Sequence, residues 1–126
     1  MKSIPVRIIS PAHNEPAISQ TFRIREIKAI LGGRDMKQEL HRHNFYFVLV
    51  LEKGKGNHVI DFTPYKVGNH CIFVMRPGQV HELTLKADSA GYLMEFNLEF
   101  YRLADRGTGE LLRKATASNL CEVNRT

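Results

Sequence analysis

The stretch that decides the fold is residues 39–54, Glu-Leu-His-Arg-His-Asn-Phe-Tyr-Phe-Val-Leu-Val-Leu-Glu-Lys-Gly. Two histidines, His41 and His43, stand one residue apart and lead into an apolar stretch rich in Phe, Tyr and Val. Such content and length are typical of a strand with both faces covered. Side chains alternate along a strand, so a strand that begins before the histidines places both of them on one face with Phe45 and Phe47. The stretch predicts two imidazoles and two aromatic rings that face the same space.

Length, composition and cysteine usage limit the class of protein. The chain has 126 residues, 43% hydrophobic and 25% charged, which is ordinary for one folded domain with its own core. Two cysteines, Cys71 and Cys121, are too few for a disulfide framework and favour a reducing compartment, so we predict a cytoplasmic protein. We find no signal-peptide core and no bilayer-length apolar stretch, which predicts no membrane partner. The formal net charge of +5 comes from dispersed basic residues and does not indicate nucleic-acid binding.

Short alternating stretches, punctuated by Gly and Pro, follow one another along most of the chain. In residues 21–31, two apolar residues alternate with Arg23 and Arg25, which predicts a half-exposed strand. The glycines of residues 53–56 predict a hairpin turn after the central strand. Further strands are expected near 4–9, 57–62, 71–75, 81–85 and 92–96. Seven to nine short strands predict an all-β fold, and inward histidines and aromatic rings favour a barrel that can hold one small ligand.

The same pattern divides the chain into three parts. Residues 1–20 are expected to form a strand and a proline-rich arm, which either closes over the barrel mouth or packs as a plain terminus. Residues 21–97 are expected to form the barrel. Residues 98–126 are expected to form a partial helical segment, with short helices near 98–103 and 111–115.

Two short motifs resemble those of the cupin proteins. The residues that carry this resemblance are His41-x-His43 with Gly54, and Pro77-Gly78-Gln79-Val80-His81. The chain departs from the cupin pattern at two places. Phe47 or Val48 stands where cupins have a glutamate, and Leu85 stands where they have an asparagine.

A wider run resembles a narrower group, the N-terminal sensor domains of AraC-type transcription regulators, over roughly residues 20–122. It includes His41-x-His43-x-Phe45-Tyr46, Gly54-x-Gly56-x-His58-x-Ile60-Asp61-Phe62-x-x-Tyr65, Phe73-x-x-x-Pro77-Gly78-Gln79-Val80-His81, Gly91-Tyr92 and Glu95-Phe96-x-x-x-Phe100. The resemblance implies a cupin-like jelly-roll barrel with an effector pocket inside it. It also implies a homodimer and a C-terminal pair of helix-turn-helix motifs that bind DNA. About 25 residues follow Phe100, too few for that pair, so DNA contact is expected only through a domain outside these residues.

Three interpretations of the histidines stay open. As a sensor, the domain would bind a small organic effector, such as a sugar, against a wall of His41, His43, Phe45, Phe47 and His81. This interpretation predicts neither an enzyme nor a cofactor. As a cupin enzyme, the domain would hold a divalent metal at His41, His43 and His81, although Phe47 cannot replace a carboxylate ligand. In the third interpretation the three histidines satisfy neighbouring carbonyl groups. The other histidines, His13, His58 and His70, are expected on the surface or in turns.

Overall fold

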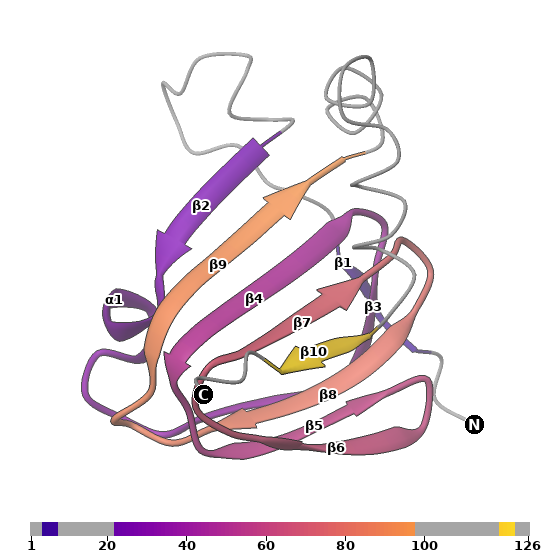
Figure 1. The fold of residues 1–126 in the computed structure, drawn as a ribbon. Coiled ribbons are helices and arrows are strands. Elements are labelled where there is room, and N and C mark those ends of the chain that lie inside the picture. The colour runs from indigo at the N-terminus through magenta and orange to yellow at the C-terminus, as the bar shows by residue number, and fades with distance from the viewer. Residues whose placement is uncertain (1–3, 8–21, 98–118, 123–126) are drawn as a thin grey trace.

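Two five-stranded sheets that pack face to face form the body of the molecule (Figure 1). The computed structural model describes residues 4–7, 22–97 and 119–122. Hydrophobic side chains from both sheets fill the space between them. This all-β, cupin-like jelly-roll barrel is the fold that the sequence predicted. The arm at 10–19 and the helices expected near 98–103 and 111–115 lie outside the described residues, so the division of the chain stays a prediction.

The first sheet has the order β1-β3-β8-β5-β6, and β1 pairs with β3 in parallel while the other pairs are antiparallel. Its strands are β1 (Val6–Arg7), β3 (Met36–His43), β5 (Gly56–Ile60), β6 (Thr63–Val67) and β8 (Val80–Leu85). The second sheet has the order β10-β7-β4-β9-β2 and is antiparallel throughout. Its strands are β2 (Phe22–Glu26), β4 (Tyr46–Lys53), β7 (Cys71–Met75), β9 (Ala90–Phe96) and β10 (Leu120–Glu122).

The stretch 21–31 is only partly the strand that its alternation predicted. Strand β2 ends at Glu26, and a short helix, α1, follows over Ile27–Leu31. The helix buries Ile27 and Leu31 in the core and ends at Gly32, whose φ of 59° is left-handed. Glycine adopts that conformation without strain, which makes it a usual helix terminator. A helix of five residues is too short for its hydrophobic periodicity to be recognised in a sequence.

The central stretch forms two strands rather than one. Strand β3 ends at His43, the chain bends at residues 44–45, and β4 begins at Tyr46 in the other sheet. The prediction of a single strand face was therefore wrong. The histidines and Phe47 nevertheless face the same interior, because the inner faces of both sheets look onto one core.

Strand β3 contains an irregularity, and because of it side chains from both halves of the strand face the interior. Its register with β8 shifts between Gln38 and His41. Alternation alone would place residues 38 and 41 on opposite faces of the strand. The extra residue of a bulge restores the match, so Gln38 and His41 both reach the interior.

Residues 53–56 do not form the predicted hairpin. They connect β4 of the second sheet to β5 of the first, so the flanking strands do not pair. Gly56 has a φ of 149°, and a Cβ there would lie 1.9 Å from the carbonyl oxygen of Thr84. Gly91 repeats this arrangement in the second sheet, where a Cβ would lie 2.0 Å from the carbonyl oxygen of Val50. Both glycines are required by close backbone approach.

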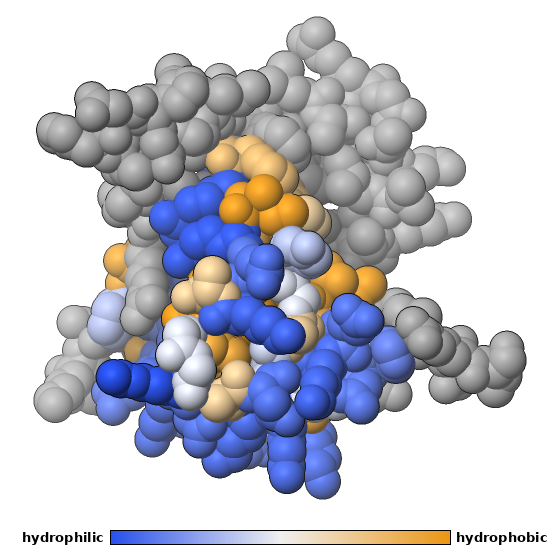
Figure 2. Space-filling view, turned by 90° about the vertical axis from the view of Figure 1, so that its left-hand side faces the viewer, coloured by the Kyte–Doolittle hydropathy of each residue, from blue (hydrophilic) through white to orange (hydrophobic). Residues whose placement is uncertain are grey.

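The face that carries β2 and α1 is mostly hydrophilic in its lower half, with hydrophobic side chains interspersed above (Figure 2). On β2 the exposed side is that of Ile24, which is 53% exposed, whereas Arg23 and Arg25 turn toward the buried Glu95. No helix within the described ranges is long and apolar enough to cross a membrane.

Candidate functional site

Four histidines gather inside one half of the barrel, and we call them the histidine cluster: His41, His43, His58 and His81. Their side chains come from three neighbouring strands of the first sheet. His41 and His43 lie on β3, His81 lies opposite His41 on β8, and His58 lies on β5. All four are buried. His58 was expected on the surface or in a turn, and that prediction was wrong. On β5 it shares the inner face with Ile60, and this alternation was visible in the sequence.

Three of the imidazoles converge on one point through their Nε2 atoms. The Nε2 of His43 lies 3.0 Å from that of His41 and 2.6 Å from that of His81, and the remaining pair is 2.9 Å apart. In a neutral ring each nitrogen offers either one N–H or one lone pair. At least two of three such atoms must be of the same kind, so the three contacts cannot all be hydrogen bonds. A cation held by these three rings would accept a lone pair from each of them.

The outer nitrogens of two rings are fixed by neighbours. The Nδ1 of His41 donates to the carbonyl oxygen of Glu39 at 2.6 Å, which leaves the Nε2 lone pair of the neutral ring facing inward. The Nδ1 of His81 lies 2.7 Å from the Nε2 of His58. Burial, and after it the proximity of His41, lowers the pKa of His58 from 6.5 to about 3, so His58 is neutral at pH 7. The Nε2 of a neutral His58 can accept a hydrogen bond from the Nδ1–H of His81. This contact orients the ring of His81 so that its own Nε2 faces His41 and His43.

The loop before β8 holds the histidine cluster in place. The backbone N–H of Gly78 donates to the carbonyl oxygen of His43 at 2.9 Å. The side chain of Gln79 donates to Asp61 at 2.7 Å and accepts from the backbone of Arg76 at 2.8 Å. The Pro-Gly-Gln-Val-His motif therefore ties the loop to both β3 and the end of β5.

Aromatic rings surround the histidine cluster on the side of the second sheet. The ring of His43 lies 4.4 Å from Phe45 and 5.2 Å from Phe47, measured between centroids. Phe47 also lies 5.0 Å from His81, and Phe73 lies 4.6 Å from His58. The cluster is therefore enclosed by its own members and by phenylalanine rings, which exclude water from it.

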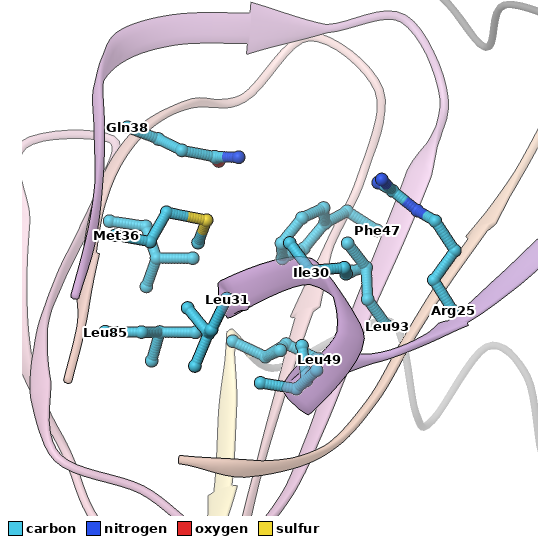
Figure 3. A pocket seen from close by; sticks show the side chains of 11 residues that line it. Arg25, Ile30, Leu31, Met36, Gln38, Phe47, Leu49, Leu85 and Leu93 are labelled. Atoms are coloured by element: carbon cyan, nitrogen blue, oxygen red, sulfur yellow. The ribbon is translucent and has the colours of Figure 1, made fainter. Parts of the chain in front are cut away.

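The other half of the interior holds a cavity, which we call the leucine cavity (Figure 3). Its volume is about 40 Å³, measured as space open to the centre of a water-sized sphere. Both sheets and α1 line it, with apolar walls that include Ile27, Met36, Leu49, Leu83, Leu85 and Leu93. Phe47 lines it as well and so lies between the cavity and the histidine cluster. Arg25 and Gln38 reach its polar end from facing sides.

An ion-pair cluster supports that polar end. Arg23 and Arg25 both donate to the Oε1 atom of Glu95, at 3.0 to 3.1 Å. The Glu95 side chain is 5% exposed, and those of the two arginines are 31% and 39% exposed. The Nε of Arg25 and the Oε1 of Gln38 are buried and have no hydrogen-bond partner within residues 4–7, 22–97 and 119–122. Two guanidinium groups thus share one carboxylate, beside two polar atoms that no group of the described residues satisfies.

Comparison with known proteins places the chain in a family. Residues 29–123 match the model of the AraC-like ligand binding domain. The chain belongs to this family. No curated protein sequence matches this AraC-like domain.

Two solved structures are similar to this chain at low sequence identity. The W96F variant of oxalate decarboxylase from B. subtilis is 18% identical, with a TM-score of 0.46 over 64% of this chain and 22% of that one. The AraC-like domain thus spans about a fifth of the length of that enzyme. A cupin protein, BF4112 from Bacteroides fragilis, is 14% identical, with a TM-score of 0.42 over 71% of this chain and 87% of that one. At these identities the likeness concerns the fold alone.

The AraC-like domain brings together all five residues predicted as a ligand wall. His41, His43, Phe45, Phe47 and His81 are all buried, and each ring lies near at least one other ring of the set. Of these five, only Phe47 lines the leucine cavity. Their role in binding a ligand stays a prediction. Arg25, Gln38 and Glu95 were not predicted as site residues. The only signal for Glu95 was a lone acidic residue in an otherwise apolar strand.

Proposed function

We propose that this AraC-like domain is the effector-sensing domain of a transcription regulator and binds a small organic molecule inside its barrel. The leucine cavity carries this proposal, because it combines apolar walls from both sheets with two buried polar atoms that lack partners. An enclosed apolar space with a few oriented polar groups is the usual form of a small-molecule site. A sugar effector, suggested by the family resemblance, would need more polar partners than this cavity offers.

Calorimetry on chelator-treated protein against a panel of small metabolites tests this function. Leu31→Phe would extend a larger side chain from α1 into the cavity and should abolish binding of any compound that occupies it. Phe62→Ala is the control, because Phe62 is 70% exposed and does not line the cavity. Equal affinity in the wild type and Leu31→Phe would place the ligand elsewhere and contradict the proposal.

A second candidate function is metal binding by His41, His43 and His81, which form a group able to hold an ion. The convergence of three Nε2 atoms favours it, because a cation satisfies contacts that hydrogen bonds cannot. Imidazole ligands suit Zn, Fe, Ni or Cu, and such an ion would supply Lewis-acid or redox chemistry. No carboxylate stands at the position of Phe47, so the chain offers three ligands and leaves the remaining positions open. A metal-dependent activity is the enzyme alternative to a sensor.

Titration of chelator-treated protein with Co²⁺, followed by its visible absorption, tests the metal site. His43→Ala should abolish the signal, because it removes one of three ligands. His58→Ala should weaken binding by about 10- to 100-fold, as loss of a ligand's hydrogen-bonding neighbour does. His70→Ala is the control, because His70 lies in the bend between β6 and β7, outside the histidine cluster. No absorption change in the wild type would leave the histidines with a structural role.

We further propose that the domain acts as a homodimer in the cytoplasm, and that DNA is contacted by a helix-turn-helix region beyond these residues. The family match supports both proposals. Light scattering over a concentration series should exceed the monomer mass of 14.4 kDa at high concentration. Gel-shift titration of the chain alone should show no sequence-selective binding that survives moderate salt.

A further inference from the structure

We propose that the leucine cavity selects a small monocarboxylate with a short apolar body, and that Arg25 recognises its carboxylate. This inference rests on the proposed function and names the class of effector. It depends on three observations: the charge of the arginine cluster, the unsatisfied atoms at the polar end of the cavity, and the size and lining of the apolar end.

The arginine cluster carries an excess of positive charge. Arg23 and Arg25 share the single carboxylate of Glu95, so the three side chains carry a formal charge of +1. Arg25 also lines the leucine cavity, so this charge stands at its polar end. A monoanion would balance the cluster, whereas a cationic ligand would be repelled, and both effects are strengthened by the weak screening near a protein interior.

The donor that faces the ligand is already oriented. Arg25 donates its Nη2 to Glu95 at 3.0 Å, which fixes the plane of the guanidinium group. Its Nε is buried and has no acceptor in the part of the chain that the structure describes. A guanidinium N–H and a carboxylate oxygen form a strong, charge-assisted hydrogen bond. Arg23 differs, because its Nε already donates to Glu95 at 3.1 Å.

Gln38 provides a second polar contact across the polar end of the cavity. Its side-chain oxygen is buried and unpaired. Figure 3 shows its amide on the side opposite Arg25, with Leu85, Leu49 and Leu31 toward the apolar end. A side-chain amide can present either its oxygen or its N–H groups, so Gln38 can serve a hydroxyl or a carboxylate oxygen of the ligand.

The size of the cavity limits the body of the ligand. A volume of about 40 Å³ by this measure holds roughly three water molecules, at about 10–15 Å³ each. The apolar walls cannot hydrogen-bond water well, so a short hydrocarbon body suits them better. We therefore expect a carboxylate of about four to six carbon atoms, with about a fourfold gain in affinity for each methylene until the cavity is full.

The test compares ligands that have nearly the same shape and differ in charge. Chelator-treated protein is titrated in a calorimeter with acetate, butyrate, isovalerate and hexanoate, and with isovaleramide and isopentylamine as matched neutral and cationic probes. Isovalerate should bind at least about 10-fold more tightly than isovaleramide, and isopentylamine should not bind. Arg25→Gln should weaken isovalerate by about 10- to 150-fold, the range for a hydrogen bond to a charged group.

Two further variants separate the donor from the charge. Arg25→Lys keeps the charge and loses the oriented Nε, so it should also lose most of the affinity. Arg23→Gln removes one charge but keeps the Nε of Arg25, and should cost less than Arg25→Gln. Circular dichroism melts confirm that each variant is folded.

The outcomes distinguish this inference from the proposed function. Binding of isovaleramide as tight as that of isovalerate, or undiminished carboxylate binding in Arg25→Gln and Arg25→Lys, would overturn the carboxylate while the cavity remains a site. Binding of only other metabolites, lost in Leu31→Phe, would also overturn the carboxylate and leave the sensor intact. No binding in the cavity by any compound would overturn both.

Discussion

The two halves of the barrel interior are built from the same strands but differ in how they are filled. Strand β3 contributes Met36 and Gln38 to the leucine cavity and His41 and His43 to the histidine cluster. In the cluster, ring nitrogens lie within 3.0 Å of one another and rings fill the space. In the cavity, aliphatic side chains leave space, and polar atoms remain unsatisfied.

This difference separates two kinds of recognition. The histidine cluster offers lone pairs that converge on a point, which suits an ion. The leucine cavity offers volume, apolar walls and an oriented N–H, which suit an organic acid. The bulge in β3 makes the division possible, because without it only one of the two sets could face inward.

The largest effect is expected from removing Phe47, the ring that lies between the leucine cavity and the histidine cluster. Phe47→Ala removes a ring that is 2% exposed and touches both halves, so it should lower the free energy of unfolding by about 3–5 kcal/mol. Urea denaturation measures this loss, and Phe62→Ala on the surface should change stability by less than about 0.5 kcal/mol. If Phe47→Ala cost no more than the control, the ring would not separate the two halves.

Glu95→Leu tests the charge on the cavity side. It leaves Arg23 and Arg25 without their buried acceptor, so stability should fall by about 2–3 kcal/mol. This is less than the roughly 3–5 kcal/mol for a fully buried pair, because both arginines are partly exposed. Asp88→Ala is the matched control. Asp88 pairs with Lys53 at 3.4 Å with both side chains exposed, and its loss should cost at most about 0.5 kcal/mol. Equal losses in the two variants would contradict a structural role for Glu95.

Acid should act on the histidine side. The pKa of His58 is about 3 in the fold and 6.5 as its ordinary value, so between these values the unfolded chain binds a proton that the folded chain does not. The contribution is therefore present above pH 6.5 and is lost as the pH falls toward 3, by about 2 kcal/mol at pH 5. Denaturation with a chelator present measures it.

His58→Leu is the comparison for that pH series. It should flatten the stability profile between pH 6.5 and 4, because it removes the proton that only the unfolded chain takes up. His70→Leu, which removes a histidine outside the histidine cluster, is the matched control. An identical slope in His58→Leu and the wild type would show that burial of His58 does not govern the acid response.

The smallest effect is expected at Gln38. Gln38→Met replaces a buried unpaired oxygen with an apolar group of similar size, so the ligand-free protein should gain about 1 kcal/mol of stability. Thermal melts measure the gain, with Gln79→Met as the opposite case, because Gln79 is fully hydrogen-bonded and its loss should be destabilising. A loss of stability in Gln38→Met would mean that the amide already has a partner.

The sequence predicted the barrel and the meeting of His41, His43 and His81, because alternation and turn residues report burial along each strand. It could not show that the chain changes sheets at residues 44–45, since an apolar run looks the same on either side of such a bend. It missed the leucine cavity for another reason. A cavity is a property of how side chains from distant strands fail to fill space, and no local pattern records it. Arg25 and Glu95, for example, lie 70 residues apart in the sequence, so no local pattern indicates that they form an ion pair.

Gly56 and Gly91 bear on how variation in this family should be interpreted. Each sits where the backbone of a neighbouring strand passes so close that any side chain would collide with a carbonyl oxygen. A library of single substitutions would therefore show both positions as intolerant as the histidines, although neither lies in the histidine cluster or lines the leucine cavity. Loss of function at such positions reports a barrel that cannot close, and ligand contacts are better mapped by substitutions that leave the melting temperature unchanged.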